Sequence, residues 1–435
     1  MWEINGKLTD NLEEVQKHFN LKYLPMTRSL LDTDLYKFSM GQTYHHQFGN
    51  LKTTWDFRAR NVGFQKDHDL YTKEDVEEIK NQIKAYCALR FDNEELSYLS
   101  TRCPWIKTDY INFLKFWHPQ EEDFTINVDN RGGASGIDIS FAGVQEYVEY
   151  YEIPVLEICA ETYYRNHYNY DELLANFKKK TEEKIAKMKS GNYHFGTWSE
   201  FGARRRLSFE AQDWLIGRLA EEKKFTGPFY GFVGTSNVLL ARKYVVTPVG
   251  TCAHEFIECV GQGNPMLNPA YSNKIAMEAW VKEYGVWNGI WLTDTIGDEL
   301  CRRDMQKTYA TLFSGVRNDS GDPFTWGENW IKHYESLGID PKTKTLLFSN
   351  SIDSLELWDK LCRHFEGRAK PAFGIGTYWS GPQDIKPLNI VAKVVLVNGM
   401  DVAKLSDDAG KTMSRSQEYV DYLRRTLDWR LKSGK

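Results

Sequence analysis

The fold is decided by a pattern that occurs in residues 315–338, GVRNDSGDPFTWGENWIKHYESLG, and again in residues 345–367, TLLFSNSIDSLELWDKLCRHFEG. Each stretch begins with a short apolar strand, continues with a loop of Gly, Asp, Asn and Ser, and ends with an amphipathic helix. The same order recurs at residues 231–244, 244–260, 289–313 and 372–379. Six βα units in succession predict an α/β protein whose parallel sheet closes into an irregular βα barrel, in preference to a doubly wound sheet.

Polar residues follow directly after each of these six strands. They are the segments Gly234–Asn237, Gly250–Glu255, Asp294–Thr295, Arg317–Asp322, Ser349–Ser351 and Gly374–Thr377. In a βα barrel the carboxyl ends of the strands converge on one rim, and ligands bind there. We therefore expect the functional site at this rim.

The segments on either side of the repeat follow another pattern. Residues 124–130 and 136–144 alternate apolar and polar side chains, and Arg131-Gly132-Gly133 supplies the turn of a hairpin between them. A second hairpin is predicted in residues 388–406 around Asn398-Gly399, and residues 416–431 predict a terminal amphipathic helix. We expect a smaller, discontinuous α+β domain of residues 1–150 and 387–435 around a barrel domain of residues 151–386.

Composition excludes several classes of protein. With 41% hydrophobic and 26% charged residues among 435, the chain can bury a large core and is neither disordered nor fibrous. Its net charge of −5 argues against nucleic acid as a partner. The sequence has no run of ~18 apolar residues and no signal-peptide pattern, which predicts a cytoplasmic protein without a membrane partner. The seven scattered cysteines indicate neither a disulfide framework nor a zinc site.

His254 is the strongest candidate for chemistry at the predicted rim. It follows a strand and opens a helix, and a histidine placed there can act as an acid, a base, a metal ligand or a nucleophile. The alternative is a structural histidine that hydrogen-bonds its own loop. A zinc-protease site is excluded because Glu258 stands where the second histidine of HExxH is needed.

Two further loops could bind the charged groups of a substrate. Arg317 offers a planar fork for a carboxylate or phosphate, and the nearby Asp319 and Asp322 can hold a metal or sugar hydroxyl groups. A plain turn with a surface ion pair is the alternative interpretation. Gly376 and Thr377 could surround a phosphate with backbone N–H groups and a hydroxyl group.

Six motifs in order resemble the nicotinate/nicotinamide phosphoribosyltransferase family, in its bacterial nicotinate-specific type: TDLYKFSM, EFGARRR, GTSNVLLARKY, VGTCAHE, GVRNDSGDP and GIGT. The resemblance covers about residues 25 to 410 and implies a barrel of the type II phosphoribosyltransferase kind. It also implies a ligase of NAD biosynthesis that transfers the phosphoribosyl group of phosphoribosyl pyrophosphate to nicotinate, forming nicotinate mononucleotide and pyrophosphate. ATP as co-substrate, Mg²⁺ and a homodimer with shared active sites are implied as well.

The resemblance assigns roles by motif position. It implies that His254 is catalytic and accepts a phosphoryl group from ATP as a phosphohistidine, with Asp319 as the second catalytic residue; we conjecture that Glu255 polarises the histidine. It implies that Tyr36, from the neighbouring subunit, and Phe201 stack on the pyridine ring. The other implied substrate contacts are Arg204 and Thr251 for nicotinate, Arg317 and Asp319 for the ribose and phosphates, and Gly376 and Thr377 for the 5′-phosphate. No metal ligand is implied, and after Thr377 the sequence YWSGP departs from the family pattern.

Ser236 bears on the choice of substrate. Nicotinamide-specific relatives hold an aspartate at this position, and a serine removes a negative charge that would repel a carboxylate, which favours the acid. A nicotinamide-specific enzyme is the alternative within the same chemistry. A non-catalytic nucleotide-binding scaffold, or a glycoside hydrolase with a carboxylate pair from Asp294, Asp298 and Asp319, is the alternative from another class.

Overall fold

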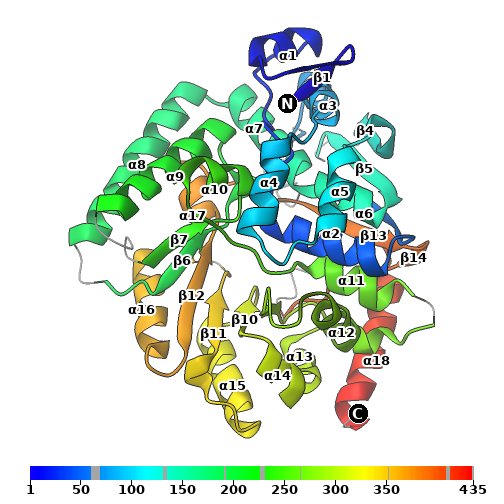
Figure 1. The fold of residues 1–435 in the computed structure, drawn as a ribbon, viewed down its shortest axis with the longest axis vertical. Coiled ribbons are helices and arrows are strands. Elements are labelled where there is room, and N and C mark those ends of the chain that lie inside the picture. The colour runs from blue at the N-terminus through cyan, green and yellow to red at the C-terminus, as the bar shows by residue number, and fades with distance from the viewer. Residues whose placement is uncertain are drawn as a thin grey trace.

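Two large sheets organise the part of the chain that the computed structural model describes, which is residues 1–59, 69–130, 135–190, 193–225, 231–264, 266–350, 352–407 and 412–433. One sheet has seven parallel strands, and the other has five antiparallel strands (Figure 1). The structure therefore confirms the α/β class. The predicted Arg131-Gly132-Gly133 turn and Ser351 lie outside the described residues.

The parallel sheet contains all six predicted strands and one more. Its members are β6 (Thr197–Glu200), β7 (Phe232–Thr235), β8 (Thr247–Pro248), β9 (Ile290–Leu292), β10 (Gly315–Asn318), β11 (Thr345–Phe348) and β12 (Lys370–Ile375). Their order is β8-β7-β6-β12-β11-β10-β9, so the strands follow the chain around a ring in which β12 lies beside β6. Among the described residues no hydrogen bonds join β8 to β9, and the curled sheet stays open there. β8 has only two residues, and one of them, Pro248, has no N–H to donate.

A helix follows each strand of the parallel sheet, as the βα pattern predicts. They are α9 (Phe209–Phe225), α10 (Val238–Tyr244), α11 (His254–Gln262), α13 (Asp298–Asp304), α14 (Lys307–Leu312), α15 (Pro323–Ser336), α16 (Leu355–Phe365) and α17 (Thr377–Ser380); α12 (Ser272–Tyr284) follows α11. In α16 the buried side chains recur every three or four residues, and Ser354 caps the N-terminus by accepting from the Leu357 N–H. Aromatic residues such as Trp198, Trp291 and Phe373, each at most 1% exposed, fill the core.

The antiparallel sheet joins the two ends of the chain. Its order is β14 (Met400–Asp401), β13 (Ile390–Val397), β3 (Lys52–Ala59), β5 (Ile137–Val144) and β4 (Phe124–Val128). The predicted β4–β5 hairpin is confirmed, and so is the tight turn between β13 and β14, where Asn398 and Gly399 both have positive φ. Because β13 pairs with β3, the predicted return of the C-terminal hairpin to the N-terminal region is observed.

Helices cover the antiparallel sheet and connect it to the parallel one. They are α1 (Leu12–His18), α2 (Leu35–Gln47), α3 (Lys73–Cys87), α4 (Asn93–Arg102), α5 (Thr108–Phe116), α6 (Gln145–Val148), α7 (Glu152–His167) and α8 (Tyr170–Ser190), and a ribbon of β1 (Trp2–Ile4) and β2 (Lys7–Thr9) precedes them. α7 packs against both α3 and the short helix η3 (Ala203–Arg205), so the domain division at residues 150/151 and 386/387 stays a prediction.

The C-terminal helix α18 (Gln417–Ser433) belongs to a separate small core. Its apolar face packs with Ile296 and Leu300, which follow β9, and with Ala403 and Leu405 of the segment after β14. Residues 403–405 are thereby held between α18 and the parallel sheet. Within the described ranges, no helix combines the length and the apolarity needed to span a membrane.

Candidate active site

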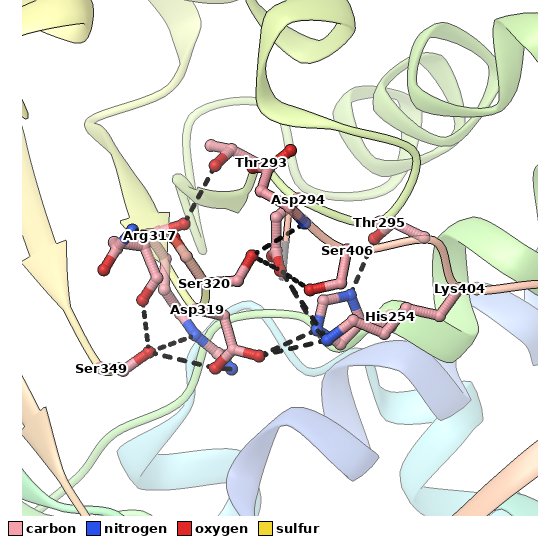
Figure 2. A network of polar contacts seen from close by, with 12 residues as sticks. His254, Thr293, Asp294, Thr295, Arg317, Asp319, Ser320, Ser349, Lys404 and Ser406 are labelled. Atoms are coloured by element: carbon pink, nitrogen blue, oxygen red, sulfur yellow. Dashed lines mark hydrogen bonds and ion pairs between the residues drawn. The ribbon is translucent and has the colours of Figure 1, made fainter. Parts of the chain in front are cut away.

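Four of the six polar segments predicted at the rim meet in one network, those that contain His254, Asp294, Arg317 and Ser349 (Figure 2). Residues 293–295 follow β9, residues 317–320 complete and follow β10, and Ser349 follows β11. His254 is the first residue of α11, and Lys404 comes from the segment after β14. The carboxyl ends of the parallel strands thus bring most of these side chains together, and Lys404 joins them from outside the parallel sheet, 150 residues from His254 in the sequence.

His254 is buried and fixed through both ring nitrogens. Nδ1 lies 2.9 Å from Thr295 Oγ1, and Nε2 lies 3.0 Å from Asp319 Oδ2 and 2.7 Å from Lys404 Nζ. The backbone N–H of Leu405 donates to the Thr295 carbonyl at 2.9 Å, which ties the Lys404 segment to the end of β9. The histidine is therefore oriented from two separate parts of the chain.

Burial, assisted by the charge of Lys404, lowers the pKa of His254 below its ordinary value. The imidazole is therefore neutral near pH 7. One tautomer donates from Nε2 to Asp319, and the other donates from Nδ1 to Thr295 and accepts from the Lys404 ammonium group at Nε2. A neutral imidazole held in this way is a competent nucleophile.

Arg317 and Asp319 form the second part of the network. The Arg317 guanidinium donates to Thr251 Oγ1 at 2.8 Å, to Ser349 Oγ at 3.0 Å and to Asp319 Oδ1 at 3.3 Å. Although burial opposes it, the charge of Lys404, the contact with His254 and the charge of Arg317 hold the pKa of Asp319 well below its usual range. The structure thus places Thr251 against Arg317, whereas the sequence predicted it near the nicotinate carboxylate with Arg204.

Asp294 extends the network behind His254. Its Oδ2 accepts from Ser320 Oγ at 2.5 Å, and its buried Oδ1 has no hydrogen-bond partner among the described residues. Ligand atoms of His254, Asp294 and Asp319 all lie within 4.8 Å of one another. The Asp294 and Asp319 carboxylates, with the unbonded Oδ1 of Asp294, fit a hard cation such as Mg²⁺. Lys404 Nζ, 3.5 Å from Asp319 and 3.7 Å from Asp294, already supplies a positive charge there.

The predicted ring-stacking residues lie on the opposite side of the rim. Phe201 follows β6, and its ring lies where a Cβ on Gly374 would be, at 2.4 Å, so that position of β12 has no room for a side chain. The Tyr36 backbone lies beside Gly250 of its own chain, and the Tyr36 and Arg204 side chains interact electrostatically. The expectation that Tyr36 reaches the site of a neighbouring subunit stays a prediction, because these contacts lie within one chain.

Ser236 has a partner that the sequence did not reveal. Its hydroxyl donates to Asp34 Oδ1 at 2.5 Å, and the Leu35 N–H donates to the Ser236 carbonyl at 2.9 Å. Burial raises the pKa of Asp34, although the hydrogen bond from Ser236 and the charge of Arg204 lower it. A carboxyl group therefore does stand at this position, contributed by the start of α2.

Glu200, the last residue of β6, connects several rim loops through hydrogen bonds to its carboxylate. It accepts from Thr235 Oγ1 at 2.6 Å, from the Gly202 N–H at 2.7 Å, from Gln212 Nε2 and from Ser380 Oγ. Ser380 ends α17, the helix that begins with Thr377 after Gly376. The turn predicted to hold a phosphate is thus anchored to the same carboxylate as the Phe201 loop.

The conjecture that Glu255 polarises His254 is not borne out. Glu255 Oε1 lies 2.7 Å from Lys37 Nζ, which also pairs with Glu152 at 2.8 Å, in a fully buried cluster. Thr295 and Asp319 occupy the positions that orient the imidazole instead. Successive residues of a helix point to different sides, so Glu255 is directed away from its neighbour.

Asp298 does not join the rim carboxylates. It accepts from Trp330 Nε1 at 2.8 Å and pairs with Arg302 of its own helix, which makes it structural. This leaves Asp294 and Asp319, both engaged with His254 and Lys404, and weakens the glycoside hydrolase interpretation. Arg206 is also structural, because it donates to Asp32 at 2.7 and 3.1 Å and to the Met26 carbonyl.

A parallel α/β sheet with a buried histidine, an arginine and two carboxylates at its carboxyl rim is the arrangement typical of an enzyme active site. Two family models match: the nicotinate phosphoribosyltransferase N-terminal domain over residues 31–160, and the nicotinate phosphoribosyltransferase (NAPRTase) family over residues 197–431. The chain belongs to the nicotinate phosphoribosyltransferase family.

Individual relatives match along nearly the whole chain. The nicotinate phosphoribosyltransferase of Acinetobacter baylyi is 38% identical over 414 residues, which cover 94% of this chain and 98% of the relative. The nicotinate phosphoribosyltransferase of Cupriavidus necator is 38% identical, with 91% and 97% covered. Crystal structures of nicotinate phosphoribosyltransferases from Porphyromonas gingivalis (32% identity, TM-score 0.79, 92% and 99% covered) and Vibrio cholerae (29%, 0.80, 93% and 94%) share the fold.

Proposed function

We propose that this protein transfers the phosphoribosyl group of phosphoribosyl pyrophosphate to nicotinate. The pyridine nitrogen forms a bond to the anomeric carbon, the bond from that carbon to pyrophosphate breaks, and the products are nicotinate mononucleotide and pyrophosphate. The observation that carries the proposal is the rim network of His254, Asp319 and Arg317 in a chain of this family. Positioned cations and carboxylates suit a transition state with positive charge on the sugar and negative charge on the leaving group.

The substrates divide between the two sides of the rim. Phe201, Tyr36 and Arg204 form the side for nicotinate, with the rings stacking on the pyridine and the guanidinium facing its carboxylate. Arg317 lies at the end of β10 and binds the ribose and phosphates, and the Gly376–Thr377 turn, which lies beside Phe201, binds the 5′-phosphate. The curled parallel sheet is proposed to be a barrel of the type II phosphoribosyltransferase kind.

ATP enters the proposal as a co-substrate, through His254. The Nε2 lone pair attacks the γ-phosphorus of ATP, the bond to the bridging oxygen of ADP breaks, and a phosphohistidine forms. Lys404, 2.7 Å from Nε2, is positioned to neutralise the transferred phosphoryl group. Hydrolysis of this phosphohistidine couples ATP to nucleotide formation, which places the enzyme in the ligase class. Mg²⁺ would be held by Asp294 and Asp319, and it would shield the charges of the polyphosphates.

We also propose that the enzyme works in the cytoplasm. A homodimer with shared active sites, in which Tyr36 of the neighbouring subunit stacks on the pyridine ring, is part of the proposal.

The test uses purified protein with nicotinate, phosphoribosyl pyrophosphate and Mg-ATP. We expect nicotinate mononucleotide, and phosphate label on the protein after incubation with γ-labelled ATP. The variant His254→Ala should lose the label and the ATP dependence, whereas His364→Ala, at an exposed histidine paired with Glu328, should keep both. Label that remains on His254→Ala contradicts the phosphohistidine, and absence of product with the wild-type protein contradicts the transferase and supports a non-catalytic scaffold.

Asp34 supplies a specific reason to test nicotinamide as the alternative substrate. Nicotinamide would donate its amide N–H to an ionised Asp34, whereas nicotinate requires this carboxyl group to be protonated or Arg204 to dominate. Because burial raises the pKa of Asp34, we expect nicotinate to be preferred. A comparison of kcat/KM for the acid and the amide decides between them.

A further inference from the structure

A cavity of about 1130 Å³ lies away from the rim, between the N-terminal segment and the starts of α4 and α9. Its lining includes Trp2, Lys22, Tyr23, Arg28, Arg165 and Phe209, and none of the rim residues named above. Cavities that bind small molecules have volumes of roughly 300–1,000 Å³, so this one has room for a ligand of that size.

The Arg28 guanidinium is the feature of this cavity that indicates a ligand site. Two of its guanidinium nitrogens, Nε and Nη1, are buried without a hydrogen-bond partner, and no carboxylate forms an ion pair with it in the part of the chain that the structure describes. Burial lowers the pKa of Arg28, although the more distant charges of Glu161 and Asp32 raise it. A guanidinium in such a position is costly unless an anion joins it.

Arg206, which lies at the same aromatic ring as Arg28, has a guanidinium with hydrogen-bond partners and serves as a comparison. The Arg28 and Arg206 guanidinium carbons each lie 5.2 Å from the centre of the Phe209 ring. Arg206 donates to Asp32, Gln212 and the Met26 carbonyl, whereas Arg28 makes no such bonds with its side chain. Only Arg28 lines the cavity.

The acidic residues of the lining do not compensate Arg28. Glu94 pairs with Arg242 at 2.7 Å, Asp213 pairs with Lys243 at 2.7 Å, and Asp92 caps α4 by accepting from the Glu95 N–H. Asp10 and Glu210 also line the cavity, and in the part of the chain that the structure describes neither forms an ion pair with Arg28.

Lys22 adds a second cation to the lining. Its Nζ donates to the neutral Asn166 Oδ1 at 2.6 Å, and within the described ranges it forms no ion pair. Its ammonium group lies 5.3 Å from the centre of the Tyr23 ring, and the Arg165 guanidinium lies at the same distance from that ring. The cavity therefore combines uncompensated cations with flat aromatic surfaces.

We propose that this cavity is a second ligand site, separate from the rim, that binds a nucleotide through its phosphate and its planar base. The phosphate oxygens accept from Arg28 and Lys22, and the base lies against the aromatic rings of Tyr23 and Phe209. Arginine and lysine bind phosphate through charge-assisted hydrogen bonds, and aromatic side chains stack on bases. The proposal does not depend on the reaction assigned to the rim.

The experiment measures binding of adenosine 5′-monophosphate to the full chain by calorimetry, with adenosine and inorganic phosphate as separate probes. We expect the nucleotide to bind, and Arg28→Met to weaken binding by roughly tenfold or more, as expected for a lost charge-assisted hydrogen bond. Arg218→Met, which removes an arginine that pairs with Glu182 outside the cavity, is the matched control and should bind as the wild type does. Arg28→Lys keeps the charge but not the fork and should lie between the two.

A third variant shows whether the nucleotide binds in this cavity or at the rim. Arg317→Met should leave this binding unchanged; if it abolishes binding while Arg28→Met does not, the nucleotide binds at the rim and the proposal is overturned. Adenosine or inorganic phosphate binding as tightly as the nucleotide would overturn the combined recognition of phosphate and base. Absence of binding to wild-type protein also overturns it, and thermal unfolding of each variant verifies that it is folded.

Discussion

Glu200 and Asp319 both lie near the carboxyl ends of strands in the parallel sheet, but their carboxylates have opposite kinds of partners. Glu200, the last residue of β6, is fully buried and accepts hydrogen bonds from neutral donors: two hydroxyl groups, an amide and a backbone N–H. Asp319, directly after β10, lies beside the cations Lys404 and Arg317 and the neutral imidazole of His254, and its side chain is 25% exposed.

The pKa of each group records this difference. Burial raises the pKa of Glu200, although its hydrogen bonds lower it, whereas the cations overcome burial and lower the pKa of Asp319. Glu200, whose two oxygens accept from neutral donors, connects loops of the fold, whereas Asp319 lies beside cations that can also bind a negatively charged substrate. A position at the rim therefore does not by itself identify a functional residue, and the partners of its side chain must be known as well.

The largest expected effect comes from removing the charge of Asp319. Asp319→Asn keeps the shape but no longer balances Arg317 and Lys404, so we expect kcat to fall by roughly 10²–10³, the loss typical of one electrostatic contact in an active site. Steady-state kinetics measures it, and denaturant unfolding should show a much smaller change in stability. A variant that keeps more than a tenth of the wild-type kcat contradicts the distinction between the two carboxylates.

Glu200→Ala should show the reverse balance. It leaves the donors of Thr235, Gly202 and Gln212 without an acceptor, and we expect the free energy of unfolding to fall by about 3 kcal/mol or more, because each unsatisfied buried group costs about 1–3 kcal/mol. Chemical denaturation measures it. Glu200→Gln, which keeps one acceptor, should recover part of the loss; equal stability of Glu200→Ala and wild type would show that Glu200 has no structural role.

A smaller effect concerns the pH dependence around Asp319. The lowered pKa of His254 keeps the imidazole neutral as the pH falls, so formation of the phosphoenzyme should persist below pH 6.5, the ordinary pKa of histidine. Lys404→Met removes a charge that lowers this pKa, so the acidic midpoint should move to higher pH. Phosphoenzyme yield against pH measures the shift, with Lys370→Met at the exposed start of β12 as the control. A midpoint that does not move removes Lys404 from the site.

Asp34 lies between the two extremes and should give the smallest effect. It is buried and bonded to a hydroxyl group like Glu200, yet it also interacts with the charge of Arg204. Asp34→Asn removes the ionised form that repels a carboxylate, so the ratio of kcat/KM for nicotinate to that for nicotinamide should rise a few-fold above pH 7. The same ratio measured in Ser236→Ala separates the hydroxyl from the carboxyl group, and an unchanged ratio in both variants places the selectivity elsewhere.

The βα units and the rim could be predicted because each depends on a local pattern. β6 was missed since Thr197–Glu200 contains only one large apolar residue, Trp198. Asp34 stood within a predicted motif, but its bond to Ser236 spans 202 residues and leaves no trace in either segment. Lys404 was missed for the same reason: its place beside His254 depends on β13 pairing with β3 and on the small core of α18. The cluster KLSDD after the second hairpin, with the same polar composition as the rim loops, was the available signal.

The position of β13 has a consequence for the order in which the enzyme matures. When residues 1–380 have emerged from the ribosome, the rim residues named above are present except Lys404. The edge of β3 that pairs with residues 390–397 is then still unpaired. An unpaired strand edge invites association with other chains. Nascent chains therefore lack Lys404 beside His254 and expose the edge of β3 until the last part of the protein emerges, and the pairing of β13 with β3 covers this edge and brings Lys404 to His254.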